Sequence, residues 1–498
     1  MASSKENIEK LDLESYFHQF RKQIIGIDQT FESPYGTQNL IYTDWTASGR
    51  LHSFVEDKML YQFGPFVANT HTETATSGAA MTLAYHKARQ IIKAHVNANA
   101  NDVLITSGSG MTGVVNKFQR ILGLKVSENL KDHTTIPDDL RPIVFVSHME
   151  HHSNQTSWLE TIADVEVVPC NNEGLVCLKT FEKCIVKHQD RKIKIAAITS
   201  CSNVTGIKTP YHQVAKLIHK YNGLCFVDFA CCAPYVSIDM HPANEDEYLD
   251  AIFFSPHKFL GGPGSAGVLV FNKKLYKNTI PDNPGGGTVS YTNPWGQHDY
   301  FDDVETREDG GTPAFLQTIR VALSIQLKEK MGVDNIEQRE EEINKVVFKT
   351  LENLPGVVIL APNHKKRLSI FSFYFEEYHF NLVVKLLNDR FGIQTRGGCS
   401  CAGTYGHFLL NVDQETSNKI KDEILHGCNT KKPGWVRLSL HPTVTNKELS
   451  FICNSLKELS IHIKDWAIDY EYDPIKNDFI HKTVAPIEKE LVERWFEI

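Results

Sequence analysis

The stretch DAIFFSPHK, residues 250–258, joins an apolar run to a polar turn, and the glycine-rich GGPG of residues 261–264 follows at once. The apolar run predicts a buried strand, which places Lys258 just beyond its carboxyl end. Burial lowers the pKa of an amine, and an amine held in this way can form a Schiff base with an aldehyde. Ser255 and His257 can hydrogen-bond an anion, and the glycines allow the backbone to approach it closely. The alternative is a surface lysine in a glycine-rich turn.

A carboxylate upstream favours a cofactor site. Residues 223–228, GLCFVD, form a short apolar run that ends in Asp228, after a helical pattern that stops at Gly223. An aspartate at one strand end and a lysine one crossover later suit pyridoxal phosphate. The carboxylate keeps the pyridine nitrogen protonated, and Lys258 holds the aldehyde. The alternative for Asp228, a helix cap or turn residue, leaves Lys258 unexplained.

Short apolar runs alternate with helical patterns between about residues 100 and 275. Six runs are typical of strands that are covered on both faces. They are residues 103–106, 143–147, 195–199, 224–228, 251–255 and 267–271. The pattern predicts a mostly parallel sheet in an α/β layer architecture, where ligands bind beyond the carboxyl ends of the strands. Five candidate site residues fall at or just after such ends: Gly108, His151, Asn203, Asp228 and Lys258.

Nine short motifs occur in order along the chain. They are ITSG (105–108), EHHSN (150–154), SNVTG (202–206), the Asp228 strand, the Lys258 turn, GGG (285–287), Gly311-Thr312-Pro313, RGGCSC (396–401) and VRLS (436–439). Together they resemble the class V aminotransferase family of fold-type-I pyridoxal phosphate enzymes, and within it the cysteine desulfurases and selenocysteine lyases, over roughly residues 40 to 460.

The resemblance implies a large cofactor-binding domain with a seven-stranded-type, mostly parallel sheet, and a smaller α/β C-terminal domain. We expect residues 1–40 to pack on the small domain, 41–312 to form the large domain, 313–460 the small domain, and 461–498 a C-terminal extension. In the extension, four aromatic residues suggest docking on the body: Trp466, Tyr470, Tyr472 and Trp495. Within the large domain, residues 281–312 have little periodicity and are expected to form an ordered active-site loop, and a helix is expected over 313–330.

The glycine-rich loop after residue 106 opens an amphipathic helix. Backbone N–H groups at a helix start form an anion cradle, so the cofactor phosphate is expected at Gly110 and Met111. The resemblance assigns three further phosphate contacts: Ser255, His257 and, from a partner subunit, Thr312. The active unit is therefore expected to be a homodimer.

Three more residues match family positions around the cofactor ring and substrate. The resemblance implies that His151 stacks on the pyridine ring and helps in proton transfer, and that Asn203 contacts both cofactor and substrate. Arg437 matches the arginine that grips the substrate carboxylate with its fork of donors. The alternatives are a metal site at His148, His151 and His152, for which no matching carboxylate or cysteine cluster is apparent, and a surface salt bridge for Arg437.

Two cysteines decide the expected reaction. In desulfurases a loop thiolate attacks the sulfur of the cysteine–cofactor adduct, which leaves a persulfide on the enzyme and releases alanine. The family spacing Arg-x-Gly-x-x-Cys-Ala falls on Arg396, Gly398, Cys401 and Ala402, so Cys401 is the expected nucleophile. Cys399 is an alternative nucleophile or a resolving thiol. The alternative to a catalytic role is that Cys399 and Cys401 are ordinary loop cysteines.

The chain departs from the family pattern at two places. After Asp228 the family usually has Gly-Ala-Gln, and the glutamine donates to the ring's phenolic oxygen, whereas residues 229–231 here are Phe-Ala-Cys. Residues 403–407 also differ from the desulfurase loop. These departures leave a second hypothesis for the reaction. The protein would then be a transaminase, epimerase or C–C lyase that does not use the loop cysteine. A third is a non-catalytic scaffold, against which the joint retention of Lys258, Asp228 and Arg437 argues.

Composition limits the partners and the compartment. The chain has 498 residues, is 41% hydrophobic and 22% charged, and carries a formal charge of −8. These values indicate a globular protein that does not bind nucleic acid, and no stretch is apolar enough for a membrane span. Eleven scattered cysteines favour a reducing compartment, by default the cytoplasm. The expected partners are a small amino acid, cysteine or selenocysteine, and a sulfur-acceptor protein.

Overall fold

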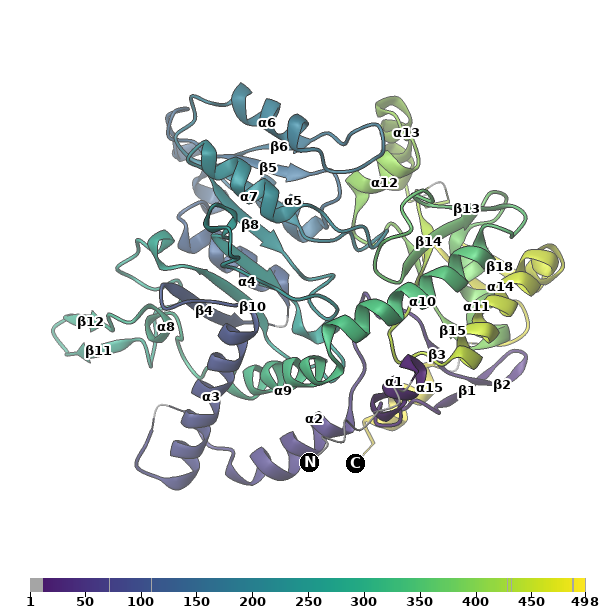
Figure 1. Cartoon of the computed structure of the whole chain (residues 1–498), viewed down its shortest axis with the longest axis horizontal. Coiled ribbons are helices and arrows are strands. Elements are labelled where there is room, and N and C mark those ends of the chain that lie inside the picture. Colours follow the sequence, from purple (N-terminus) through teal and green to yellow (C-terminus); the bar gives the residue numbers. More distant parts are fainter. Residues whose placement is uncertain are drawn as a thin grey trace, which may run out of the picture.

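The computed structural model describes residues 12–70, 72–108, 110–427, 429–430, 432–485 and 488–497. Two α/β parts lie side by side, and the long helix α10 (Val333–Leu351) runs from the larger to the smaller (Figure 1). Within the described ranges, no helix combines the length and the apolar character needed to cross a bilayer.

A seven-stranded sheet forms the larger part. In spatial order its strands are β4 (Asp102–Ser107), β10 (Gly267–Asn272), β9 (Ala251–Phe254), β8 (Leu224–Asp228), β7 (Lys194–Thr199), β5 (Ile143–Ser147) and β6 (Asp164–Val168). Strand β10 runs antiparallel to both neighbours, and the other pairings are parallel. The predicted mostly parallel sheet is confirmed. Strand β6 was missed because Asp164 and Glu166 interrupt its apolar run.

Helices cover both faces of this sheet, which explains its continuous apolar strands. One face packs against α3 (Thr76–His95), α6 (Leu178–Lys187), α7 (Tyr211–Lys220) and α9 (Phe315–Met331). The other packs against α4 (Met111–Ile121) and α5 (His152–Leu159). Successive residues of β8 alternate between the two cores: Val227 belongs to the first and Phe226 to the second.

The smaller part is a four-stranded antiparallel sheet. Its strands are β13 (Val357–Ile359), β14 (Ile370–Phe375), β17 (Trp435–Ser439) and β16 (Arg396–Gly398). Helices α10, α11 (Phe380–Phe391) and α14 (Asn446–Trp466) share its hydrophobic core. Between β16 and β17 lie α12 (Gly403–Leu409) and α13 (Gln414–Leu425).

The N-terminal residues contact both parts: Phe17 and Phe20 belong to the hydrophobic core of the larger part, whereas residues 36–42 lie against the smaller part. They form α1 (Leu13–Arg21), β1 (Thr30–Ser33), β2 (Gly36–Asn39) and β3 (Ile41–Tyr42), followed by α2 (Ser53–Asp57), η1 (Lys58–Phe63) and η2 (Gly64–Phe66). Helix α1 contacts α10, β2 contacts α11, and β3 pairs in parallel with β15 (Ile393–Gln394). Residues 1–11 of the predicted N-terminal segment lie outside the described residues.

The segment 281–312 is more regular than predicted. It contains a hairpin of β11 (Val289–Thr292) and β12 (His298–Tyr300), followed by α8 (Val304–Arg307). The hairpin projects from the large part (Figure 1). Its strands are largely exposed and only four and three residues long, which is too short for an alternating pattern to identify them.

The C-terminal extension continues as β18 (Tyr470–Asp473), β19 (Asp478–His481) and α15 (Glu488–Trp495). Tyr470 is buried and donates its hydroxyl to Asp389 Oδ2 at 2.8 Å, and the Arg390 guanidinium lies 4.2 Å from the Trp466 ring. The expected docking is wrong for Trp495, which is 69% exposed on α15. The remaining short helices are η3 (Glu128–His133), η4 (Glu245–Glu247), η5 (Pro256–Lys258), η6 (Lys273–Leu275) and η7 (Ala467–Asp469).

Candidate active site

A cavity of about 490 Å³ lies beyond the carboxyl ends of β7, β8 and β9. It brings together ten of the eleven predicted site residues: Gly110, Met111, His151, Asn203, Asp228, Ser255, His257, Lys258, Cys401 and Arg437. Thr312 is exposed and is not among the residues that line it. The assignment of Thr312 to the site of a partner subunit therefore stays a prediction.

One end of the cavity is suited to a phosphate. Helix α4 begins there, and its first N–H groups have no partners within the helix. The Met111 N–H donates to Ser255 Oγ at 2.8 Å. A methyl group added at Gly110 would lie 3.4 Å from Ser255 Oγ and 3.9 Å from the His257 ring. Because residue 110 is a glycine, no side chain covers the backbone between these two groups. The N-terminus of α4, the Ser255 hydroxyl and the His257 imidazole surround this uncovered backbone. Together they fit the phosphate group of the predicted cofactor.

Lys258 and Asp228 lie deeper in the cavity. Burial lowers the pKa of Lys258, while the nearby Cys231 and Asp228 act in the opposite direction. Asp228 ends β8, is 2% exposed and accepts the Ala230 N–H at 2.7 Å. Burial raises its pKa to about 6, against the opposing effects of that hydrogen bond and of Lys258. A buried carboxylate of this kind fits a protonated pyridine nitrogen, whose positive charge would compensate it.

His151 is held in a neutral form. It caps α5, where its Nδ1 accepts the Ser153 N–H at 3.1 Å. Burial, with the positive charge of Lys258, lowers the pKa of His151 to about 3. The ring is therefore uncharged at neutral pH, and an uncharged aromatic ring can stack on a flat ligand. His148 and His152 bond elsewhere, to the Gly174 carbonyl and the Gly403 N–H. The described residues contain no group of three ligating side chains arranged for a metal.

A carboxylate links two arginines at the opposite wall. Asp44 Oδ1 accepts from Arg437 Nη2 at 2.7 Å, and its Oδ2 accepts from Arg396 Nε at 2.8 Å. Arg437 also donates to the Asn203 carbonyl at 3.1 Å, and is 3% exposed. Two guanidinium groups around one carboxylate leave an excess of positive charge, which suits the carboxylate of an amino acid.

The loop with Cys401 is pinned in a strained conformation. Ser400 and Cys401 have φ of 53° and 55°, a left-handed conformation that costs roughly 1–2 kcal/mol per residue. Asn203 Nδ2 donates to the Ser400 carbonyl at 2.7 Å, and the His152 N–H donates to the Cys401 carbonyl at 2.8 Å. Cys401 is exposed and lines the cavity, whereas Cys399 is half-buried, packs on a hydrophobic cluster and is not among the lining residues.

Two further thiols face the cavity beside the lysine. Cys231, at the family's glutamine position, and Cys201 both line it and are buried. Their sulfurs lie 3.6 and 3.7 Å from one oxygen, the Ser202 carbonyl. Hydrogen bonding with Cys201 lowers the pKa of Cys231, and Lys258 and Arg437 add to this effect. The position that carries a glutamine donor in the family is therefore occupied here by a thiol whose pKa is lowered.

The segment before α2 covers the lysine turn. The Gly49 N–H donates to the His257 carbonyl at 2.9 Å, and the Gly261 N–H donates to the Arg50 carbonyl at 2.8 Å. The two backbones approach so closely that a methyl group at Gly49 would lie 1.9 Å from the Phe259 carbonyl oxygen. Only glycine allows this approach without a shift of the lysine turn.

Gly49→Ala is therefore expected to lower the free energy of unfolding by about 1–3 kcal/mol, because the added methyl group overpacks this contact. The measurement is a urea titration of both proteins under the same conditions. Gly286→Ala is the matched control, since no atom lies within 4 Å of the added methyl group, and it should change stability by less than about 0.5 kcal/mol. Equal effects of the two substitutions would contradict the close contact.

Sequence reasoning missed two buried carboxylates, Asp44 and Glu150, that lie behind the lining of the cavity and hold its residues in place. Asp228 is the last residue of β8 and Asp44 lies two residues beyond β3, so a carboxylate at the end of a strand was an available signal. Glu150 is fully buried and accepts from the Thr199 N–H at 2.9 Å and from Asn154 Nδ2 at 2.7 Å. It thereby fixes the turn that carries His151.

A seven-stranded sheet with a lysine, a buried carboxylate and a helix start at its strand ends defines a fold-type-I enzyme architecture. The chain belongs to the class V aminotransferase family, whose model matches residues 41–451. It is 28% identical over 391 residues to a probable cysteine desulfurase of Halalkalibacterium halodurans, covering 77% of this chain and 88% of that relative. Identity to a probable cysteine desulfurase of Staphylococcus epidermidis is 26% over 385 residues, or 76% and 87% of the two chains.

Solved structures share the fold. The apo structure of a cysteine desulfurase from Thermococcus onnurineus NA1 superposes with a TM-score of 0.69 at 21% identity, over 89% of this chain and 98% of that one. A cysteine desulfurase from Escherichia coli gives a TM-score of 0.68 at 20% identity, over 90% and 98%. The predicted family and fold, and the resemblance to the cysteine desulfurases, are confirmed.

Proposed function

We propose that the protein is a pyridoxal phosphate-dependent enzyme that removes sulfur from L-cysteine, or selenium from L-selenocysteine, and releases alanine. The name shared by the relatives supports this reaction. The cavity supports it independently, because its phosphate end, buried carboxylate and buried lysine fit the cofactor and its linked arginines suit an amino-acid carboxylate.

Pyridoxal phosphate, when bound, supplies an electron sink for the substrate's α-carbon. Arg437 holds the substrate carboxylate, and the Lys258 amine moves the α-proton. The Cys401 thiolate attacks the substrate sulfur, so that an S–S bond forms while the carbon–sulfur bond breaks. The sulfur stays on Cys401 as a persulfide, and protonation of the carbon that it leaves yields alanine.

One observation carries this proposal: Cys401, Lys258 and Arg437 line a single cavity. Cys401 is exposed and lies on a loop fixed at its backbone, so the thiol can reach both the cavity and the solvent. Cys399, two residues earlier, lacks these properties. The loop thiol of the proposed reaction is therefore Cys401.

Product analysis with the cofactor-loaded protein and L-cysteine tests the reaction. Wild type should release alanine over many turnovers in the presence of a reducing thiol, and Cys401→Ser should lower the rate at least about a thousandfold, since a serine hydroxyl is a far poorer nucleophile toward sulfur. Cys399→Ser is the matched control and should keep the rate within about threefold.

No alanine from wild type, together with a changed cofactor spectrum on addition of other amino acids, would reject the desulfurase. That result would favour a transaminase, epimerase or C–C lyase that uses the same lysine and arginine. Equal activity of wild type and Cys401→Ser would reject the role of the thiol.

We also propose a cytoplasmic homodimer that passes sulfur to an acceptor protein. Large apolar side chains are exposed on the segment between α2 and α3, on α3 itself and on the projecting hairpin, among them Tyr61, Leu83 and Trp295, which supports burial against a second copy. Each subunit's Thr312 would then reach the other's phosphate site. The described cysteines are all free thiols, which supports a reducing compartment, and the exposure of Cys401 supports transfer to a partner.

A further inference from the structure

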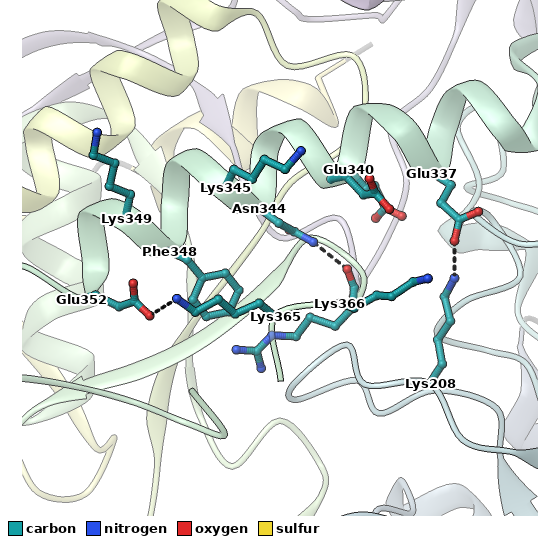
Figure 2. A pocket seen from close by; sticks show the side chains of 12 residues that line it. Lys208, Glu337, Glu340, Asn344, Lys345, Phe348, Lys349, Glu352, Lys365 and Lys366 are labelled. Carbon is teal, nitrogen blue, oxygen red and sulfur yellow. Dashed lines mark hydrogen bonds and ion pairs between the residues drawn. The ribbon is translucent and has the colours of Figure 1, made fainter. Parts of the chain in front are cut away.

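A second cavity, of about 620 Å³, lies away from the catalytic one and shares none of its lining residues. Helix α10 forms one wall, the loop 365–367 another, and Lys208 of the large part closes an end (Figure 2). Its volume is in the range of small-molecule sites. The cavity therefore spans the junction between the two parts of the protein.

The charges around this cavity favour an anion. Lys345, Lys349 and Lys366 form no ion pair with another described residue, whereas Lys208 and Lys365 are paired with Glu337 and Glu352.

The other acidic side chains do little to offset these cations. Glu340 is buried, accepts the Ser369 N–H at 3.0 Å and has its pKa raised to about 8 by burial, so it is mostly uncharged at neutral pH. Glu341 is then the one unpaired carboxylate on the cavity wall within the described residues. A cluster of unpaired lysines on a chain with a net charge of −8 is a local site of positive potential.

The floor of the cavity combines an aromatic ring with unused hydrogen-bonding atoms. The Arg367 guanidinium lies 4.5 Å and Lys365 Nζ 5.7 Å from the centre of the Phe348 ring. Arg367 and Asn344 are each 5% exposed. Arg367 Nε and Nη2, and Asn344 Oδ1, have no hydrogen-bond partner among the described residues. Leaving such groups unmet costs about 1–3 kcal/mol each. These atoms have almost no solvent-accessible surface, so an occupant of the cavity meets them only when the Arg367 side chain shifts.

The same floor touches the back of the catalytic wall. Arg367 Nη1 donates to the Thr205 carbonyl at 3.0 Å, and the Leu368 N–H donates to the Gly206 carbonyl at 3.0 Å. Thr205 and Gly206 belong to the turn that carries Asn203. On its other side, Asn203 contacts the Ser400 and Arg437 groups of the catalytic cavity. This short turn therefore connects Arg367, which lines the second cavity, to Asn203, which lines the catalytic cavity.

We propose that this second cavity binds a small organic anion, a flat apolar body that bears a phosphate or carboxylate, and that its occupancy changes the affinity of the catalytic cavity for its amino acid. The lysines bind the anionic group and the stems of the lysines, with Phe348, contact the body. Movement of Arg367 is transmitted through the Thr205–Gly206 turn to Asn203. Binding does not depend on the proposed reaction, and only the coupling rests on the proposed substrate site.

Calorimetric titration of the cofactor-loaded protein with 1-naphthyl phosphate tests the binding, with neutral 1-naphthol for comparison. Naphthyl phosphate should bind at least about tenfold more tightly than naphthol. Lys345→Glu/Lys349→Glu should weaken its binding at least about tenfold, since both charges lie within a Debye length of the cavity. Lys447→Glu/Lys464→Glu is the matched control, because it makes the same change of net charge on α14, outside this cavity.

Equal affinities for the phosphate and the alcohol, or equal affinities of the two double variants, would overturn the site. The coupling is measured as the dissociation constant of unreactive L-alanine with and without saturating naphthyl phosphate. A change of about fivefold or more, seen in wild type and abolished in Lys345→Glu/Lys349→Glu, is expected. Binding of the phosphate with no change in alanine affinity would overturn the coupling. These titrations need no turnover, so their results can be interpreted even if the desulfurase assay shows no activity.

Discussion

Lys258→Ala is expected to abolish covalent attachment of pyridoxal phosphate and to lower the rate of alanine release at least about ten-thousandfold, because the variant lacks both the amine that bonds the aldehyde and the group that moves the α-proton. Burial lowers the pKa of Lys258, so its amine becomes unprotonated and nucleophilic at a lower pH than the amine of a free lysine. Attachment is measured by borohydride reduction followed by intact mass, and the rate by alanine analysis.

Lys328→Met provides the matched control. Lys328 is also buried, and burial lowers its pKa to about 7, but its amine donates to the Ala233 carbonyl at 2.6 Å and does not line the catalytic cavity. This variant should keep the covalent attachment and lose roughly 1–3 kcal/mol of stability through the unmet carbonyl groups. Covalent attachment in Lys258→Ala, or its loss in Lys328→Met, would refute the assignment of the lysine.

Arg437→Ala is expected to lower kcat/KM for L-cysteine about 10²–10³-fold, since a buried, charge-assisted contact to a carboxylate contributes about 2–5 kcal/mol. The substitution also removes one partner of Asp44, so part of the loss could arise from a disturbed wall. Comparison with L-cysteine methyl ester, which lacks the carboxylate charge, separates the two effects. Wild type should bind the acid far better than the ester, and the variant should treat them alike.

Arg437→Lys completes this test. A lysine keeps the positive charge and lacks the fork that contacts both Asp44 and the Asn203 carbonyl, so it should restore only a small part of the lost activity. If Arg437→Ala still preferred the acid as strongly as wild type does, another group, such as Arg396 on the same carboxylate, would be the residue that holds the substrate.

The sequence was informative where local patterns decide the structure. Strands such as β8 and β9 are covered on both faces, so their apolar runs were recognisable, and the residues that follow them were assigned to one edge of the sheet. That rule is why His151, Asn203, Asp228 and Lys258 were predicted together. The hairpin of β11 and β12 was missed because its strands are largely exposed and carry no such pattern.

Features that depend on contacts between distant segments were not predictable. The bond of Asp44 to Arg437 depends on how β3 lies against the smaller sheet, and no local pattern fixes that register. The second cavity likewise forms between exposed side chains of α10 and a loop. Each of those lysines, taken alone, is an ordinary surface residue.

The pairing of β3 with β15 delays the completion of the catalytic wall until translation is nearly over. Asp44 and Arg437 are 393 positions apart, and a ribosome that adds ~5–20 residues per second needs roughly 20 to 80 seconds to make that interval. The strands of the large sheet, residues 102–272, emerge well before the partner of β3. For most of that time, until β15 is made, β3 presents an unpaired edge, and an edge that stays unpaired is open to mispairing.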